Sequence, residues 1–417
     1  MSRVIQVFEF EKLSLAPDEK GRSLSKNELE KLYEYNDKND NIYFTGIRDG
    51  VRFKNYVGVI QIGSLTIEIL PKTDRKNSEE KEYQIWHRVL LNMLRVCNHI
   101  KVDSVSEASL KRKHNSILDL YYDMYLDEVQ SLIRNGLIKK YRRDSGNVSA
   151  LKGRLHFAKN IQCNLIHRER FYTEHQVYDY ENQLNQILLK GLNVLNSLTH
   201  NPSLKEKIIR VKSNFPEIKE VPITKDHFDR LSLNRKTTSY QKTIQIARMI
   251  ILNYSPDIKS GQENMLTLLF DMNKLWEEYI YRMLLKSKIE GFQITAQEKQ
   301  KFWETRRVMP DIVIRKNISG ATETFVIDTK WKVLDIKNPK PNDDDLKQMY
   351  VYNMYWEAKK SMLLYPNSSQ TDESFGNFWK GRDRLMENQC KVGFVNILNP
   401  DSTLNYSIGK EILSKLN

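Results

Sequence analysis

The sequence is poor in the residues and motifs that mark several large classes of protein. Its three cysteines, Cys97, Cys163 and Cys390, are widely spaced and form no CxxC pair, so they predict neither a disulfide framework nor a zinc site. Its eight histidines include no HxxxH pair, and no serine stands in a nucleophile-elbow context. Zinc hydrolysis and acyl transfer are therefore unsupported, and a reducing cytoplasm fits the cysteine usage.

Long apolar runs and a nucleotide-binding loop are also missing. No segment approaches the roughly 18 apolar residues that a membrane span needs, and charges interrupt the N-terminal MSRVIQVFEFEKLSL. We therefore expect a soluble, intracellular protein with no membrane partner. The string nearest to GxxxxGKS/T is GNFWKGRD (376–383), which has Arg where the loop requires Lys and lacks the following Ser/Thr. Any nucleotide hydrolysis is expected from another chain.

Positive charge is in excess. The 417 residues carry 66 Lys+Arg against 53 Asp+Glu, a net charge of +13, with a pI near 9.3. This balance favours a polyanionic partner, most commonly nucleic acid, although a lysine-rich solvated surface explains the charge equally well. The length predicts two or three domains, and 40% hydrophobic residues suffice to bury their cores.

The sequence predicts a mixed α+β (α/β) protein with three domains. Residues 1–82 predict a β-rich domain, a small sheet or barrel, because apolar residues alternate between Gly-containing turns. Residues 83–255 have mostly helical apolar spacing, with one helix ending at Gly136. Within them, 136–157 predicts a projecting basic β-hairpin that turns at Asp144-Ser145-Gly146-Asn147.

Residues 256–417 alternate between helical and strand patterns. The order begins with a helix over MLTLLFDMNKLWEEYIYRMLLKS (265–287), continues with strands and a second helix over 345–360, and ends with further strands. This order is typical of an α/β sandwich with a mixed sheet.

Charged residues interrupt the two segments of this domain that most resemble core strands. Side chains of a strand alternate between faces, so Asp328 and Lys330 in VIDTKWK point the same way. The runs 307–315 and 323–332 are joined by NISGAT, which contains a Gly turn, so they can pair as a hairpin. Asp311 is then expected beside Asp328 near one edge of the sheet.

Two adjacent carboxylates repel each other and are costly to bury unpaired, so the pair predicts a cation. Oxygen ligands with retained water suit Mg²⁺, which we expect Asp311 and Asp328 to bind. Lys330 is expected to orient the attacking water or to stabilise charge on the pentavalent phosphate. The alternative is an ion pair of Asp328 with Lys330 or Lys332 that braces a structural sheet.

This constellation resembles the PD-(D/E)xK nuclease motif, through the PD of MPDIVIRK (309–316) and the DTK of VIDTKWK (326–332). Nucleases of this kind often take a further acid from the preceding helix, and Glu277 stands in a suitable place, although a solvated helix face is an equal alternative for it. Gln348 and Tyr352 lie four residues apart on one helix face, where related nucleases place a Gln and a Tyr near the site. Core packing of the tyrosine is again the alternative.

Beyond the nuclease motif, several stretches together resemble the McrC subunit of McrBC-type, modification-dependent (type IV) restriction systems. The resemblance implies a Mg²⁺-dependent endonuclease subunit of prokaryotic antiviral defence, located in the cytoplasm. It implies that such a chain binds a hexameric AAA+ GTPase of the McrB type, stimulates GTP hydrolysis on that partner, and cleaves methylcytosine-containing foreign double-stranded DNA. The resemblance covers roughly 85–417 and runs through LKGRLHFAKNI (151–161), YDYENQLNQILLKGL (178–192), FDMNKLWEEYI (270–280), MPDIVIRK, VIDTKWK and LKQMYVYNMYW (346–356).

The hairpin 136–157 sits where this family carries a projecting finger that enters the partner ring, which makes 83–255 a partner-binding domain. Tyr141, Arg142, Arg143 and Asn147 are the residues we expect to contact the motor, on position alone. A DNA-contacting hairpin and an inert solvated loop are the alternatives. For the whole chain, the alternatives are a non-catalytic adaptor that only activates the motor and a stand-alone repair or recombination nuclease.

Overall fold

The computed structural model describes residues 3–71, 80–99, 117–255, 264–318, 321–332, 341–366, 375–380 and 384–416. These residues form two compact units, each drawn from several stretches of the chain. The first unit takes its residues from 1–4, 60–66 and 112–268, and the second from 5–59, 67–111 and 269–417. Each unit combines separate stretches of the chain, so the units do not test the predicted domain boundaries. The boundaries at 82/83 and 255/256 stay predictions.

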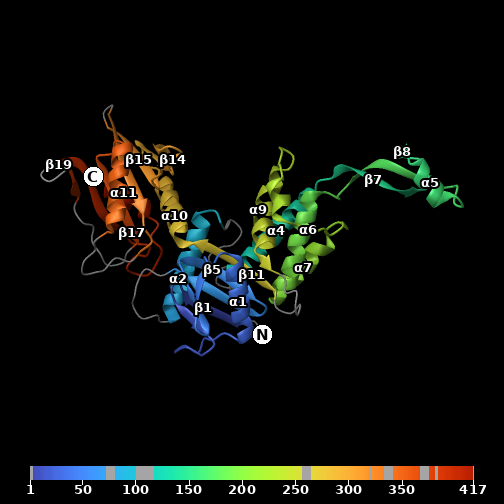
Figure 1. Cartoon of the computed structure of the whole chain (residues 1–417), viewed down its shortest axis with the longest axis horizontal. Coiled ribbons are helices and arrows are strands. Elements are labelled where there is room, and N and C mark those ends of the chain that lie inside the picture. Colours follow the sequence, from blue (N-terminus) through green and yellow to red (C-terminus); the bar gives the residue numbers. More distant parts are fainter. Residues whose placement is uncertain are drawn as a thin grey trace. The chain divides into compact units, whose positions relative to one another are not determined.

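The first unit is a group of helices with a strand-rich projection (Figure 1). Four strands have residues in both units: β1 (Arg3–Phe8), β5 (Tyr56–Ile62), β6 (Leu65–Leu70) and β11 (Met265–Asp271). Together with β10 they form one sheet, in the order β1-β6-β5-β11-β10. The first unit's own elements are α4 (Ile117–Asn135), β7 (Lys140–Val148), β8 (Arg154–Leu155), α5 (Phe157–Asn164), β9 (Phe171–Asp179), α6 (Gln183–Leu198), α7 (Pro202–Ser213), α8 (Lys225–Asp229), η1 (Thr238–Tyr240), α9 (Gln241–Leu252) and β10 (Tyr254–Ser255).

The helices of the first unit pack through apolar faces, and a glycine allows one close approach. A Cβ on Gly191 of α6 would lie 2.3 Å from the hydroxyl of Tyr125 on α4. That buried hydroxyl donates to the carbonyl of Leu188 at 2.8 Å, so the contact also satisfies a polar group. Helix α4 ends at Asn135, and Gly136 follows with a φ of +87°, as the sequence predicts for a helix C-terminus.

The projection differs from the predicted hairpin. Residues 144–147 do not turn: β7 runs straight through them and pairs along its whole length with β9, from Lys140 opposite Asp179 to Val148 opposite Phe171. Gly146 does not have a positive φ, and the backbone stays extended there. The turn signal fails because the partner strand lies more than 20 residues further along the chain, and β8 and α5 form the end of the projection.

The second unit carries a six-stranded mixed sheet. Its strand order is β12-β15-β16-β17-β19-β18, with β16, β17 and β19 parallel to one another and the remaining pairs antiparallel. Helix α11 connects β16 to β17, the crossover that two parallel neighbours require. The unit's own elements are β2 (Lys12–Ser14), α1 (Lys26–Lys38), β3 (Phe44–Ile47), β4 (Gly50–Phe53), α2 (Glu80–Val96), α10 (Met272–Ser287), β12 (Phe292–Ala296), β13 (Gln300–Trp303), β14 (Arg306–Val308), β15 (Ile312–Ile318), β16 (Ala321–Thr329), α11 (Asp343–Tyr355), β17 (Lys360–Pro366), β18 (Gly376–Lys380), β19 (Arg384–Val395) and α12 (Ile408–Ser414).

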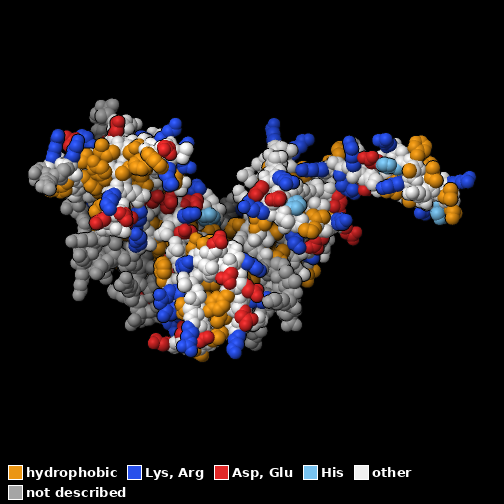
Figure 2. Space-filling view, in the orientation of Figure 1, with side chains coloured by type: hydrophobic (Ala, Val, Ile, Leu, Met, Phe, Trp, Pro, Cys, Tyr) orange, Lys and Arg blue, Asp and Glu red, His pale blue; other side chains and the backbone are white. Residues whose placement is uncertain are grey.

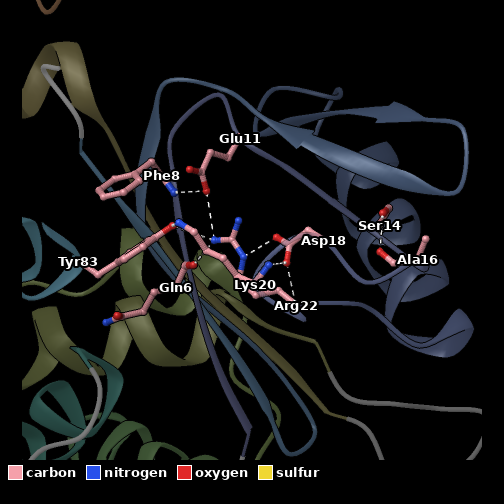
Figure 3. Close-up of polar contacts among 9 residues, drawn as sticks. All are labelled: Gln6, Phe8, Glu11, Ser14, Ala16, Asp18, Lys20, Arg22 and Tyr83. Carbon is pink, nitrogen blue, oxygen red and sulfur yellow. Dashed lines mark hydrogen bonds and ion pairs between the residues drawn. The ribbon is translucent and has the colours of Figure 1, made fainter. Parts of the chain in front are cut away.

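The N-terminal part of the second unit is held by an arginine (Figure 3). The guanidinium of Arg22 donates to Asp18 and to the carbonyl of Gln6, both at 2.6 Å, and to Glu11 at 3.2 Å. It also lies 3.1 Å from the hydroxyl of Tyr83 on α2. These bonds fix an otherwise irregular segment, so this charge cluster serves the fold.

The predicted fold class is confirmed: the chain is mixed α+β, with a mixed sheet in its C-terminal part. Two details differ. MLTLLFD was expected to begin a helix but forms β11, and α10 starts only at Met272, where Asp271 caps it by accepting from the Asn273 N–H at 2.9 Å. Helix α1 was not expected at all. Among the described residues, none of the helices has the length and apolarity to cross a bilayer.

Candidate active site

The two aspartates meet at the ends of β15 and β16. These strands are antiparallel with Ile312 opposite Ile327, so the next pair outward is Asp311 opposite Asp328. Both face the same way as Val313 and Val326, which lie in the core beneath α11. The predicted hairpin and the expected neighbourhood of the two carboxylates are therefore both found in the structure.

Asp311 is oriented by the residue that follows Asp328. The backbone N–H and the hydroxyl of Thr329 both donate to Asp311 Oδ2, at 2.7 and 2.9 Å. Oδ1 takes no hydrogen bond from the part of the chain that the structure describes. One oxygen thus fixes the carboxylate while the other remains available.

Lys330 lies on the same side, and its ammonium forms two ion pairs and one hydrogen bond. Its Nζ is 2.7 Å from Asp328 Oδ2, 3.3 Å from Asp345 Oδ1 and 3.2 Å from Gln348 Oε1. Burial alone would lower the pKa of Lys330, but the two carboxylates outweigh that effect and raise it. Lys330 is therefore a fixed ammonium rather than a base.

Both aspartates favour protonation more than an exposed carboxyl does. Burial raises the pKa of Asp328, and the charge of Asp311 adds to the shift. Burial also raises the pKa of Asp311, with Glu277 adding to it. Lys330 opposes both shifts without cancelling them, so the site as folded has more negative charge than its lysine compensates.

Glu277 reaches this site from α10. Its Oε1 accepts from the Gln297 side chain at 2.8 Å, and the Gln297 N–H donates to the carbonyl of Asp311 at 3.0 Å. Burial raises the pKa of Glu277, the Gln297 amide opposes this, and Asp328 adds to it. Gln297 has a φ of +52°, a left-handed conformation that a non-glycine residue seldom adopts. No sequence pattern singles out Gln297.

Gln348 and Tyr352 share a face of α11, as predicted, and extend the hydrogen-bond network. Gln348 accepts from Lys330, its amide donates to the Tyr352 hydroxyl at 2.7 Å, and that hydroxyl donates to the carbonyl of Met309 at 2.9 Å. This chain of bonds ties the lysine to the backbone two residues before Asp311.

Asp345, in the first turn of α11, is a member of the site that sequence reasoning missed. Its residue is 9% exposed, and its two oxygens lie 3.3 Å from Lys330 and 3.5 Å from Lys332. Three consecutive aspartates open α11, and only the helix register shows which of them turns inward.

The chain beyond Lys330 is anchored by Trp331. Its indole N–H donates to Glu9 Oε1 at 2.6 Å, and its ring lies 5.3 Å from that of Trp276 on α10. Because Trp331 is buried, the preceding lysine cannot shift along the strand direction without breaking this packing.

The donor set fits a hard divalent cation with retained water. Among the described residues, no three Asp, Glu, His or Cys side chains form a ready-made metal cage. Mg²⁺ commonly binds through one or two carboxylates and completes its shell with water and phosphate oxygens. Asp311 and Asp328 supply such a pair, and their excess negative charge is the observation that calls for a cation.

The residues predicted to contact a partner lie along the projection rather than at its end. Tyr141 is 71% exposed and packs against the ring of Tyr178, and Arg143 is exposed as well. Arg142 is bound to Asp179 at 3.0 Å. Asn147 exchanges two 2.7 Å hydrogen bonds with Asn164, so it shapes the projection.

The end of the projection exposes apolar side chains that the sequence analysis did not single out (Figure 2). They come from α5, from the loop before β8 and from the loop after α5, and we call them the tip cluster: Leu151 at 60% exposed, Phe157 at 74%, Ile161 at 61%, Leu165 at 67% and Ile166 at 88%. A cluster of this kind marks an interaction surface in most soluble proteins.

Comparison with known proteins gives consistent matches. Residues 51–366 match the family model described as McrBC 5-methylcytosine restriction system component. The chain is 22% identical over 275 residues to the type IV methyl-directed restriction enzyme EcoKMcrBC of Escherichia coli K12, covering 61% of this chain and 78% of that protein.

Two solved structures share the fold. One is a half-complex from a tetradecameric assembly of Thermococcus gammatolerans McrB AAA+ hexamers with bound McrC; the match has a TM-score of 0.70, 18% identity and 99% coverage of both chains. The other is the McrBC complex of the same organism, with a TM-score of 0.51, 15% identity, and coverage of 69% of this chain and 88% of the other.

Proposed function

Because the chain belongs to the family of McrBC 5-methylcytosine restriction system components, we propose that it is the Mg²⁺-dependent DNA endonuclease subunit of such a system. Its partner is an AAA+ GTPase of the McrB type, and its substrate is double-stranded DNA containing methylcytosine. The observation that carries the proposal is the pairing of Asp311 and Asp328 at the ends of β15 and β16, with Lys330 2.7 Å from Asp328.

The roles of the residues follow from their contacts. Asp311 and Asp328 would hold Mg²⁺, which would supply polarisation of a phosphodiester oxygen and a lowered pKa of a water. Thr329 holds Asp311 in place through Oδ2. Lys330, a fixed ammonium, stabilises the negative charge that develops on the phosphate during hydrolysis. Glu277 and Gln348 position the groups around this centre.

The tip cluster supports the partner assignment. Five apolar side chains gathered at the end of a narrow projection gain stability only when another surface covers them. The absence of a phosphate-binding loop from this sequence agrees with GTP binding on the partner alone. We propose that the projection docks this chain to the GTPase.

The decisive experiment compares wild type and Asp328→Ala, each mixed with an AAA+ GTPase of the McrB type, on methylated duplex DNA with Mg²⁺ and GTP. Cutting should disappear in the variant, while complex formation and stimulated GTP hydrolysis persist. Continued cutting by the variant would remove the catalytic assignment and leave a non-catalytic adaptor. Cutting by the wild-type chain without any GTPase would instead support a stand-alone nuclease.

A further inference from the structure

A short hairpin formed by β13 and β14 adjoins the candidate active site and combines positive charge with exposed aromatic rings. Its sequence, KQKFWETRRV (299–308), contains four cationic residues and a single acid, Glu304. The four cations are Lys299, Lys301, Arg306 and Arg307. All four side chains are exposed, and within the described part of the chain none of them is ion-paired with an acid. Figure 2 shows basic and hydrophobic side chains beside one another over the region that Figure 1 labels α11, β14 and β15.

The pairing of this hairpin is unfavourable for an isolated protein. Lys301 lies directly opposite Arg307, and like charges in that position destabilise a strand pair. The hairpin forms a two-stranded sheet of its own, without the neighbours that normally stabilise such a ribbon. An unfavourable charge pair on an exposed ribbon suggests that a polyanion supplies the missing negative charge.

The two aromatic residues have different surroundings. The ring of Phe302 lies 5.9 Å from that of Tyr355 on α11, so it braces the hairpin against the unit. Trp303, opposite Arg306, is 59% exposed and has no ring partner among the described residues. An exposed indole beside arginines is suited to stacking on a nucleotide base or sugar.

The hairpin is held at a fixed place relative to the aspartates. Val308, the last residue of β14, packs against the core beneath α11, and Tyr352 donates to the carbonyl of Met309 at 2.9 Å. Asp311 is four positions beyond Arg307 in the chain, so the two residues are at most about 13 Å apart. That is the length of about four base-pair steps of a DNA duplex.

We propose that the β13–β14 hairpin is a DNA clamp: Lys301 and Arg307 bind backbone phosphates within about four base pairs of the cleaved bond, and Trp303 packs against the duplex beside them. This inference rests on the proposed nuclease function and names the surface that holds its substrate. A protein surface is the competing occupant, but charge complementarity favours DNA, because the single acid of the hairpin cannot offset four cations.

The test measures binding of the full chain to a fluorescent 30-base-pair duplex in EDTA, which prevents cutting, between 50 and 200 mM salt. Lys301→Ser with Arg307→Ser should reduce the slope of log affinity against log salt by about 1.8, because two phosphate contacts are lost. Trp303→Ala should weaken binding at least about fivefold and leave the slope unchanged. Thermal melts verify that the variants fold.

Matched controls come from the same unit. Trp379→Ala removes an indole that is 60% exposed on β18, and Lys286→Ser with Lys410→Ser removes two exposed lysines that lie outside the hairpin, on α10 and α12. Both should bind as wild type does. The clamp is overturned if the hairpin variants keep the wild-type slope and affinity, if the controls lose as much, or if wild type does not bind the duplex at 50 mM salt. It is also overturned if the hairpin variants bind DNA normally but lose binding to the GTPase, since the surface would then contact protein.

The outcomes separate this inference from the proposed function. If Asp328→Ala still cuts while the hairpin variants bind weakly, the catalytic assignment fails and the clamp stands. If Asp328→Ala is inactive while the hairpin variants bind normally, only the clamp fails.

Discussion

Replacing Asp328 with asparagine is expected to stabilise the metal-free protein at neutral pH and to remove its response to Mg²⁺. Asp328 is 2% exposed and lies opposite Asp311, and the ammonium that neutralises it is shared with Asp345. An amide of nearly the same shape fills the same space beside Lys330. The substitution therefore removes repulsion without opening a cavity.

The size of the effect follows from the raised pKa values. Burial, followed by the neighbouring carboxylate, raises the pKa of Asp328 above that of an unfolded chain. Between the unfolded and the folded pKa the folded state binds more protons, so the free energy of unfolding falls as pH rises through this range. Each pKa unit corresponds to about 1.4 kcal/mol. Removing the charge should thus restore on the order of 1–3 kcal/mol at pH 8, or about 1–3 °C in Tm for a chain of this length.

The assay is thermal unfolding of wild type, Asp328→Asn and a control, Asp37→Asn on the exposed face of α1, at pH 5 and pH 8. In EDTA the advantage of Asp328→Asn should be clear at pH 8 and shrink at pH 5, where the wild-type carboxyl is largely protonated. Mg²⁺ at one hundred times its dissociation constant should stabilise wild type by about 2.7 kcal/mol and Asp328→Asn by much less. A lower Tm for Asp328→Asn at pH 8 in EDTA, or equal Mg²⁺ shifts in both proteins, would refute the reasoning.

Three further predictions concern other parts of the chain. Asp345→Asn should lower kcat for DNA cleavage by roughly 10- to 100-fold with little change in KM, because it removes a carboxylate that orients the active-site lysine; a changed KM with an unchanged kcat would contradict this. Glu298 is bound by an arginine that lowers the pKa of Glu298 to about 2, so wild type should lose about 1–2 kcal/mol as pH falls from 4.5 to 2, and Glu298→Gln should not, as measured by acid unfolding. Phe157→Ser with Ile166→Ser should weaken GTPase binding at least tenfold in a pull-down titration and leave duplex binding intact. Leu385→Ser, a change at another exposed apolar residue, is the control. An equal loss of GTPase binding in the double variant and the control would rule out a docking role for the tip cluster.

The local features of the candidate site were predictable because they depend on short-range periodicity. A strand alternates with a period of two, and the runs 307–315 and 323–332 are close enough in sequence to pair as a hairpin, so the neighbourhood of Asp311 and Asp328 follows from sequence. The Gly of the predicted turn lies outside the described residues. The shared face of Gln348 and Tyr352 follows in the same way from the helical period.

The features that escaped prediction depend on long-range contacts. The tetrad 144–147 has the composition of a turn, yet β9, a partner more than 20 residues away, keeps it extended. Asp345 became part of the site through the register of α11, and Gln297 through a left-handed backbone conformation. No local pattern encodes which of three adjacent aspartates faces a lysine, because that choice is made by packing.

The hydrogen bond from Trp331 to Glu9 joins residues 322 positions apart, and it has a consequence for the timing of synthesis. A ribosome adds about 5–20 residues per second, so Glu9 emerges roughly 15–60 seconds before its partner exists. During that interval the segment that carries Asp328 and Lys330 has not been made, and a chain released early lacks the aspartate pair. Under the proposed nuclease function, an incompletely synthesised copy therefore lacks the centre that would cut DNA.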